Sequence, residues 1–348
     1  AKNIYWGNLK SPFKGHNPDW TAQAALEFID EHKDQPFYLH CCSTLLHGPN
    51  GEWFKSMMEK ELVTGEGYLK QPLGLIDRES VWKRIQKAGL TEAEVGYLWM
   101  DDSLGLILDK LDALGIADNT IVVFVSDHGS EKKGSLIKTR GTEIPCLIRW
   151  PKVIKPGSVS HGLLQNTDFV PTWFELAGAK IPEDYHMDGK SLVPMFEDPS
   201  VSVREFIYAE QGAARAIKTD TLEYLSIRYT DEQIAMAQSK RSDRAYKTLL
   251  GLSSGISRAR YFHPDIFSAD QLYDLSKDPN SQKNVAKDSS YAGQLKKMKA
   301  ILTRKVKELG PRPYGDFVPG KGTSDAEASK KVLDQLAAYH AKEGKKKK

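Results

Sequence analysis

Residues 126–129 place groups that bind metal ions directly after a strand-forming run. Residues 120–125 are β-branched or aromatic, and Ser126, Asp127, His128 and Gly129 follow them. The run predicts a buried strand, and open α/β sheets bind their ligands at the carboxyl ends of such strands. Asp127 offers a carboxylate oxygen and His128 an imidazole nitrogen, which together suit a divalent cation. The alternative is a turn-forming Asp beside a surface His, since short motifs often match by chance.

A lysine and a second histidine, each beyond the end of a strand-forming run, are two further candidate site residues. Lys133 stands a few residues past the metal pair, and a lysine ammonium is a compact charge with three donors. Lys132 is adjacent, so a register error of one residue would exchange the two, and either could be an exposed loop lysine instead. His47 follows the apolar run 36–46 and precedes Gly48-Pro49. It is a candidate catalytic residue or a polar residue satisfied at a strand end, whereas His40 within the run is taken as structural.

The pattern of apolar residues predicts the elements that position these groups. We expect helices over 21–32, with Thr21 as N-cap, over 91–114, opened by a capping box, and over 169–176. Strands are expected over 36–46, 120–126 and 144–149, with 47–90 mostly loop. Alternating strands and helices predict an α/β fold with a mostly parallel sheet and helices on both of its faces.

The pattern changes after about residue 201. Short strands are expected over 205–209, 214–219, 224–229 and 271–275, and a lysine-rich amphipathic helix over 291–308. This order predicts a small antiparallel sheet with one helix packed on it. The predicted organisation is therefore an α/β domain over 1–200, an antiparallel subdomain over 201–310, and a partly helical, lysine-rich tail over 311–348.

Composition excludes several classes of protein. The chain has 348 residues, of which 40% are hydrophobic, which is ample for a large domain and a smaller one. A net charge of +3 is too small to indicate a nucleic-acid partner. No apolar run is long enough to span a membrane. The three cysteines, Cys41, Cys42 and Cys146, do not form a disulfide framework and are expected to be small buried thiols.

Several further segments carry a resemblance to a known family. They are residues 141–151 (GTEIPCLIRWP), 166–172 (NTDFVPT), 188–192 (DGKSL) and 272–279 (LYDLSKDP). In this order and spacing, residues 20–306 resemble the sulfatases of the alkaline phosphatase superfamily. The resemblance implies that Asp127 and His128 bind Ca²⁺ or a similar cation. Well-known calcium sulfatases more often carry Asn at the position of His128, and imidazole suits softer ions, so the identity of the metal stays open.

The resemblance also gives roles to the other two candidates. Lys133 would bridge the sulfate and the nucleophile, and His47 would hydrogen-bond the leaving oxygen or the sulfate. We expect Asp127 and His128 to lie side by side at the end of a central parallel strand, facing a cleft on which Lys133 and His47 converge. The substrate would be a sulfated small molecule or glycan, and family members are often secreted, periplasmic or lysosomal. The sequence does not indicate the oligomeric state.

One family feature does not occur in the chain. Sulfatases oxidise the Cys or Ser of a Cys/Ser-x-Pro/Ala-x-Arg signature to formylglycine, their nucleophile, and none of the 348 residues belongs to such a signature. We therefore expect this chain to correspond to the later part of a sulfatase and not to hydrolyse aryl sulfates alone. Two alternatives remain: a phosphonate or phosphate ester hydrolase of the same superfamily, and a sulfatase-like protein that binds a partner without turnover.

Overall fold

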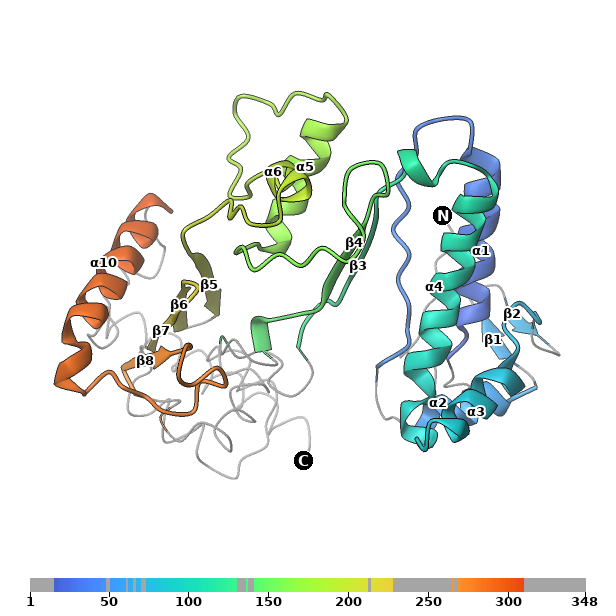
Figure 1. Ribbon diagram of the computed structural model, residues 1–348, viewed down its shortest axis with the longest axis horizontal. Coiled ribbons are helices and arrows are strands. Elements are labelled where there is room, and N and C mark those ends of the chain that lie inside the picture. The colour runs from blue at the N-terminus through green and yellow to red at the C-terminus, as the bar shows by residue number, and fades with distance from the viewer. Residues whose placement is uncertain are drawn as a thin grey trace, which may run out of the picture. The chain divides into compact units, whose positions relative to one another are not determined.

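A computed structural model describes residues 16–47, 51–60, 62–64, 67–69, 73–129, 136, 141–211, 214–227, 265 and 268–309 (Figure 1). The chain divides into two compact units, one formed by residues 1–122 with 149–152 and the other by 123–148 with 153–348. The predicted domain boundaries near residues 200 and 310 stay predictions, and the predicted tail at 311–348 lies outside the described residues.

The first unit is built mainly from helices. Its elements are α1 (Pro18–His32), α2 (Gly51–Met58), the antiparallel strands β1 (Leu62–Thr64) and β2 (Gly67–Leu69), α3 (Arg78–Lys87) and α4 (Val95–Ala113). Helix α1 lies along α4, as Figure 1 shows. One buried cluster joins α2, α3 and α4 through Trp53, Val81 and Trp99, all nearly inaccessible to solvent. Because aromatic side chains bury large apolar areas, this cluster makes a rigid support for the segments around it.

The long helix predicted over 91–114 is confirmed, including its start. Thr91 and Glu94 form a reciprocal capping box around a 3-10 turn, and α4 continues from Val95 to Ala113. Thr91 Oγ1 accepts from the backbone N–H of Ala93, while the Glu94 carboxylate accepts from the Thr91 N–H. These bonds satisfy donors that a helix start leaves free, which is why the pattern is visible in the sequence.

Four predictions for this unit were wrong. Helix α1 begins at Pro18 rather than at 21, and its N-cap is Asn17, not Thr21; a proline is favourable in a first turn because it lacks an N–H. Residues 36–44 are not paired into a strand within the described residues, and Cys41 and Cys42 are consequently exposed rather than buried. A strand requires a neighbour for its backbone groups, and no periodicity in the sequence supplies one. The stretch expected to be mostly loop holds α2 and α3.

Strands β3 (Val122–Val125) and β4 (Cys146–Arg149) pair with each other in a two-stranded sheet. Backbone bonds continue beyond it, from Ser126 N–H to the Pro145 carbonyl at 3.4 Å and from Gly129 N–H to the Gly141 carbonyl at 3.1 Å. From the first of these bonds to the second, the residue number rises from 126 to 129 in one segment and falls from 145 to 141 in the other. The two segments therefore run antiparallel. The predicted strands at 120–126 and 144–149 are thus present, but no parallel sheet occurs among the described residues.

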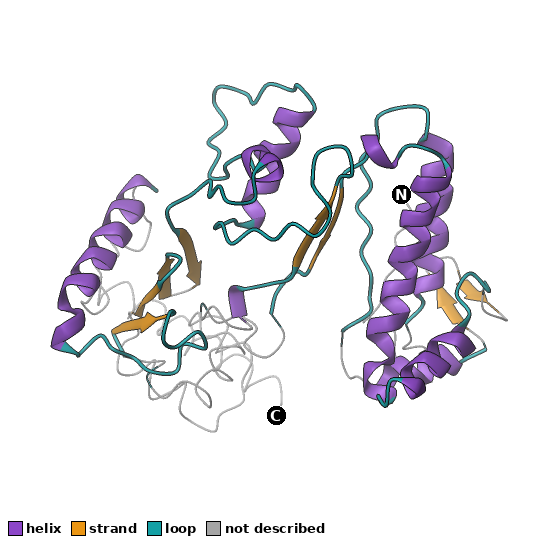
Figure 2. Ribbon diagram, in the orientation of Figure 1, coloured by secondary structure: helices purple, strands orange, loops and turns teal. Residues whose placement is uncertain are grey.

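The second unit contains an antiparallel sheet with one helix packed on it, as the sequence predicts (Figure 2). Strands β5 (Ile207–Gln211), β6 (Ala214–Lys218), β7 (Leu222–Ile227) and β8 (Asp270–Asp274) follow that spatial order, each antiparallel to the next. Helix α10 (Ala292–Glu308) packs Met298 and Leu302 against Ile217, Tyr224 and Leu272 of the sheet. Two shorter helices, α5 (Phe169–Leu176) and α6 (Val193–Glu197), precede the sheet, and α5 has the predicted bounds. None of the described helices is long and apolar enough to cross a bilayer.

Candidate active site

The structure places Asp127 and His128 next to each other just past β3, whereas the central parallel strand and the cleft expected for them stay predictions. Asp127 Oδ2 lies 3.3 Å from His128 Nε2, and the side chains are 82% and 35% exposed. The turn that carries them is held by Ser126 Oγ, which donates to the His128 carbonyl at 2.9 Å. Gly129 is buried and pairs its N–H with Gly141. Both side chains are therefore accessible to a ligand, on a backbone that the strand pair fixes.

The donor atoms of this pair fit a cation. His128 Nδ1 lies 2.8 Å from the Gly129 carbonyl and so carries the proton, because a carbonyl only accepts. Nε2, 3.3 Å from the Asp127 carboxylate, then has an acceptor-only group as its neighbour. Two such acceptors lie together favourably when a positive charge sits between them, either a proton on Nε2 or a bound metal ion. No third His, Cys, Asp or Glu joins them in a metal-sized group in the part of the chain that the structure describes.

His47 stands at the end of a tight turn in the first unit. Its N–H donates to the Thr44 carbonyl at 3.4 Å, and its own carbonyl accepts from the indole N–H of Trp53 at 3.0 Å. Leu46, directly before it, has a φ of +71°. A branched side chain rarely adopts this left-handed region, and such strain costs about 1–3 kcal/mol and persists where surrounding contacts enforce it. The turn is therefore imposed by its neighbours, with the His47 side chain exposed to solvent.

The contacts that enforce the turn come from the buried cluster. Trp53 is almost fully buried on α2, and its ring lies against Gly96 at the start of α4. A Cβ at Gly96 would lie 2.5 Å from that ring, so only glycine leaves room for it. The other side of the turn is held by His16, whose Nδ1 lies 3.3 Å from Thr44 Oγ1. Sequence reasoning singled out His47 but missed Trp53, Gly96 and His16, because the Trp53–Gly96 and His16–Thr44 contacts join residues that are distant in the sequence.

Burial changes the chemistry of His16. Its side chain is inaccessible to solvent, and this burial, followed by the positive charge that nearby His47 can carry, lowers the pKa of His16 from 6.5 to about 4. His16 is therefore neutral near pH 7, and it serves as an uncharged hydrogen-bonding partner behind the turn.

The other site predictions are not tested by the described residues. Lys133 and its neighbour Lys132 lie outside the described residues. His47 belongs to the first unit and Asp127 and His128 to the second, and the two units are described separately. The predicted convergence of Lys133 and His47 on one cleft therefore stays a prediction.

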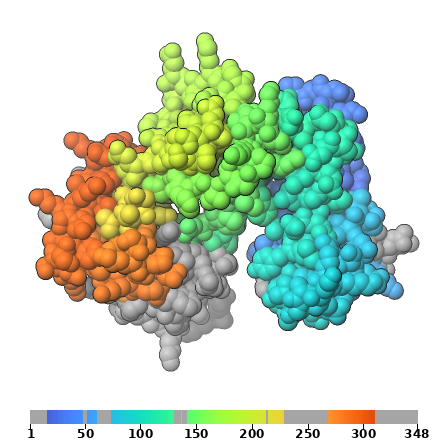
Figure 3. Space-filling view, in the orientation of Figure 1, coloured from blue at the N-terminus to red at the C-terminus, as the bar shows by residue number. Residues whose placement is uncertain are grey.

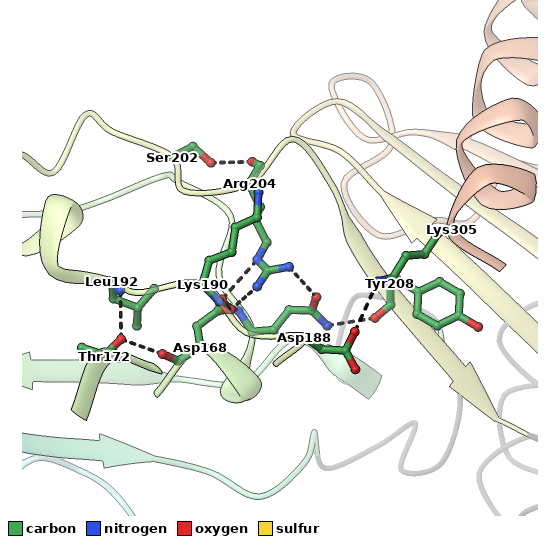
Figure 4. Close-up of polar contacts among 10 residues, drawn as sticks. Asp168, Thr172, Asp188, Lys190, Leu192, Ser202, Arg204, Tyr208 and Lys305 are labelled. Carbon is green, nitrogen blue, oxygen red and sulfur yellow. Dashed lines mark hydrogen bonds and ion pairs between the residues drawn. The ribbon is translucent and has the colours of Figure 1, made fainter. Parts of the chain in front are cut away.

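A buried ion pair that sequence reasoning missed organises the second unit (Figure 4). The carboxylate of Asp168 accepts from Arg204, whose Nε lies 3.1 Å from Oδ2 and whose Nη2 contacts Oδ1. It also accepts from the backbone N–H groups of Gln165 and Lys190 at 2.7 and 2.8 Å. The two charged side chains are 0% and 9% exposed. Because a buried carboxylate is tolerated only when its oxygens are bonded, all these partners belong to one structural unit.

The same network fixes the segment 188–192. Thr172 Oγ1 donates to the Asp168 carbonyl at 2.6 Å and accepts from Leu192 N–H at 2.9 Å. At Gly189 a Cβ would lie 2.0 Å from the Thr167 carbonyl oxygen, so the backbone passes too close for any side chain. Two of the segments that carried the resemblance, 166–172 and 188–192, are therefore packed together, which gives both a structural role.

Comparison with protein families identifies the chain. The model of the family described as Sulfatase matches residues 2–179, more than half of the sequence. A second model, described as N-sulphoglucosamine sulphohydrolase, C-terminal, matches residues 128–233. The chain belongs to the sulfatase family, a group of enzymes within the alkaline phosphatase superfamily. This confirms the family predicted from the sequence.

Two characterised relatives show how much of a sulfatase the chain represents. It is 32% identical to an ulvan-active sulfatase of Formosa agariphila, over 58% of this chain and 38% of that protein. It is 28% identical to an N-acetylglucosamine-6-O-sulfatase of Bacteroides thetaiotaomicron, over 61% of this chain and 34% of that protein. The chain thus matches little more than a third of the length of these relatives.

Solved structures give the fold. A protein from the glycosaminoglycan metabolism of Bacteroides thetaiotaomicron is similar over 84% of this chain and 54% of its own, with a TM-score of 0.57 and 22% identity. A complex with k-i-k-neocarrahexaose is similar over 93% of this chain and 60% of its own, with a TM-score of 0.55 and 19% identity. These similarities assign a sulfatase-like α/β fold to the chain.

Proposed function

We propose that this protein takes part in the hydrolysis of sulfate esters, with Asp127 and His128 as metal ligands and His47 and Lys133 as catalytic groups. The observation that carries the proposal is the arrangement of Asp127 Oδ2 and His128 Nε2, 3.3 Å apart and accessible past the end of β3. This pair occurs in a chain that belongs to the sulfatase family. We also propose that the α/β domain predicted from the sequence has a mostly parallel sheet.

Each residue has a defined task in such a reaction. A divalent cation, when bound, polarises a sulfuryl oxygen and stabilises negative charge there. Asp127 and His128 hold that cation, with the His128 tautomer set by the Gly129 carbonyl. The ammonium group of Lys133 stabilises charge on the sulfuryl oxygens. His47 donates a hydrogen bond or a proton to the leaving oxygen, from a turn that Trp53 holds in place.

The metal proposed is Ca²⁺, with an open alternative. Calcium prefers oxygen ligands, which Asp127 supplies, whereas the imidazole of His128 also suits softer divalent ions. Direct binding measurements with Ca²⁺, Mn²⁺ and Zn²⁺ in parallel would assign the ion.

A sulfated polysaccharide is the substrate class that the relatives support. One relative is an ulvan-active sulfatase, another is an N-acetylglucosamine-6-O-sulfatase, and one structural neighbour holds k-i-k-neocarrahexaose. Each of these names describes its own protein. Together they favour a sulfated glycan over a small aryl sulfate as the substrate of the reaction proposed for this protein.

A second function is favoured by one sequence observation. Since no Cys/Ser-x-Pro/Ala-x-Arg signature occurs in the 348 residues, the chain could bind a sulfated glycan without turning it over. We infer that the nucleophile is not supplied by these residues, and that the chain alone releases no sulfate.

Sulfate release by two proteins would test these proposals. One is the chain alone, and the other is the chain joined to the formylglycine-bearing segment of a sulfatase relative. Both are incubated with ulvan, carrageenan, a glycosaminoglycan, and a phosphate and a phosphonate ester. The proposal requires sulfate release by the joined protein only. Release by the chain alone would identify an unrecognised nucleophile, with Ser126, Ser130 and Ser135 the first to mutate. If only the phosphate or phosphonate ester is hydrolysed, the protein is a phosphate or phosphonate ester hydrolase and not a sulfatase.

A further inference from the structure

The positive charge of the protein is concentrated on and just before α10. Residues 283–308 contain eight Lys or Arg and two Asp or Glu, a net charge of +6, whereas the whole chain has a net charge of +3. The other residues together therefore have a net charge of −3. Such an asymmetry indicates an anionic partner when the charges lie together on the surface.

We propose that the outer face of α10, with the pocket at its start, is a docking surface for a sulfated polysaccharide chain, separate from the residues proposed to act in hydrolysis. The proposal rests on the proposed function only for the chemistry of its partner. The docking surface is defined by the side chains of Lys287, Lys296, Lys297 and Lys307.

Three lysines on or near α10 form ion pairs with carboxylates of the same unit. Lys299 Nζ lies 2.6 Å from Asp270 Oδ2 on β8, and Lys305 Nζ lies 3.4 Å from Asp188 Oδ1. Lys277, just past β8, lies 3.1 Å from Asp274. These pairs tie α10 and its surroundings to the rest of the unit.

The lysines of the docking surface differ in this respect. Lys287, Lys296, Lys297 and Lys307 are exposed, and no ion pair to a carboxylate of the described residues is found for any of them. Lys296, Lys297 and Lys307 lie on the side of α10 opposite the buried Met298 and Leu302, given about 100° of rotation per residue. From Lys296 to Lys307 the helix extends about 16 Å. Lys296 and Lys297 thus stand together near the start of α10, and Lys307 lies near its end on the same side of the helix.

A pocket lies at the start of α10, beside Lys287 and Lys296. A cavity of about 370 Å³ is lined by Lys287 and Lys296 together with Asp288, Ser289 and Leu295, and by Ala286, Ala292 and Lys299. Its size is at the lower end of the range of small-ligand sites. Two lysine ammonium groups suit a sulfate group, and the Ser289 hydroxyl suits the hydroxyls of a sugar. Figure 3 shows the atoms of α10, in orange and red, at the surface of this part of the molecule.

The lining favours a sulfated sugar over a nucleic acid. Proteins that bind single-stranded nucleic acid combine positive charge with aromatic side chains on which bases stack. None of the eight residues that line the pocket is aromatic. A sulfated polysaccharide needs cations and hydrogen-bonding groups, which the lining supplies.

Binding of a fluorescently labelled heparin oligosaccharide, measured by anisotropy at two salt concentrations, tests the docking surface. The variant Lys287→Gln/Lys296→Gln/Lys297→Gln/Lys307→Gln should bind at least about tenfold more weakly and show a shallower salt dependence. A matched variant, Lys87→Gln/Lys152→Gln/Lys155→Gln/Lys180→Gln, removes four exposed lysines and the same charge elsewhere. It should retain affinity within about twofold.

Several outcomes would overturn the proposal. Equal losses in the two variants would mean that net charge, not the docking surface, governs binding. Equal or tighter binding of a double-stranded DNA oligonucleotide would reject the sulfated polysaccharide as the partner, and so would equal binding of unsulfated hyaluronan. The docking variant should leave sulfate release from a small aryl sulfate by the joined protein unchanged. Heparin binding that depends on the four lysines, in a protein without sulfatase activity, would support the docking surface and reject the proposed function.

Discussion

The indole N–H of Trp53 donates to the carbonyl oxygen of His47 at 3.0 Å. This bond joins the buried cluster of the first unit to the turn that carries the proposed catalytic histidine. The turn also contains Leu46 at a φ of +71°, a conformation that relaxes unless neighbouring contacts maintain it. Trp53 is therefore a positioning residue, which acts on His47 through the backbone.

The variant Trp53→Phe keeps an aromatic ring in the cluster and removes this hydrogen bond. A hydrogen bond of this kind contributes about 1 kcal/mol, so the kcat of the joined protein should fall by up to about tenfold with little change in KM. Trp82→Phe is the control, because Trp82 packs against Phe54 in the same cluster but makes no described bond to the turn. If kcat is unchanged in Trp53→Phe, or falls equally in the two variants, Trp53 does not position His47.

His16 should make the stability of the first unit depend on pH. It is neutral when folded, with a pKa lowered to about 4, and it takes up a proton below about pH 6.5 when unfolded. The unfolded state thus binds more protons between these values, so the free energy of unfolding falls as the pH drops from about 6.5 to about 4. The full difference is on the order of 3 kcal/mol.

Urea unfolding followed by tryptophan fluorescence at several pH values would measure this effect. His16→Gln should flatten the dependence in that window, whereas His161→Gln, at an exposed position, should not. A wild-type unfolding free energy that is constant from pH 7 to pH 4.5 would show that His16 is not buried as described.

The ion pair between Asp168 and Arg204 should dominate the stability of the second unit. Arg204→Met leaves a fully buried carboxylate without its cation, which costs on the order of 3–5 kcal/mol. Lys83→Met breaks an exposed pair with Glu79, which solvent screens, and should leave the denaturant midpoint almost unchanged. Denaturant midpoints of the two variants would compare them, and a similar small loss in both would show that Asp168 is solvated.

The parts of the fold that could be predicted have local causes. The capping box at Thr91, the apolar period of α4 and α5, and the short strands before α10 are all visible within a few residues of sequence. The proposed metal pair could be singled out because a strand-forming run ends at Val125, just before Ser126 and Asp127. Each of these signals depends on neighbours along the chain.

The parts that could not be predicted depend on distant partners. Asp168 and Arg204 are 36 residues apart, and nothing near either one indicates the other. Asn17 and Thr21 are both good N-caps by type, and only the position of Pro18 in the first turn decides between them. The run 36–46 has the composition of a strand, but composition does not provide the neighbouring strand that its backbone requires.

The central claim is that Asp127 and His128 hold the cation of a sulfatase. Its most direct test is metal-dependent sulfate release from a sulfated polysaccharide by the joined protein, for the wild type, Asp127→Asn and Asp184→Asn. Asp184 is an exposed carboxylate outside the metal pair and serves as the matched control. Calorimetry with the same three proteins measures metal affinity without turnover. The account predicts that Asp127→Asn loses at least about 100-fold in activity and about 10–100-fold in metal affinity, while Asp184→Asn keeps both. Wild-type activity and metal affinity in Asp127→Asn would contradict it.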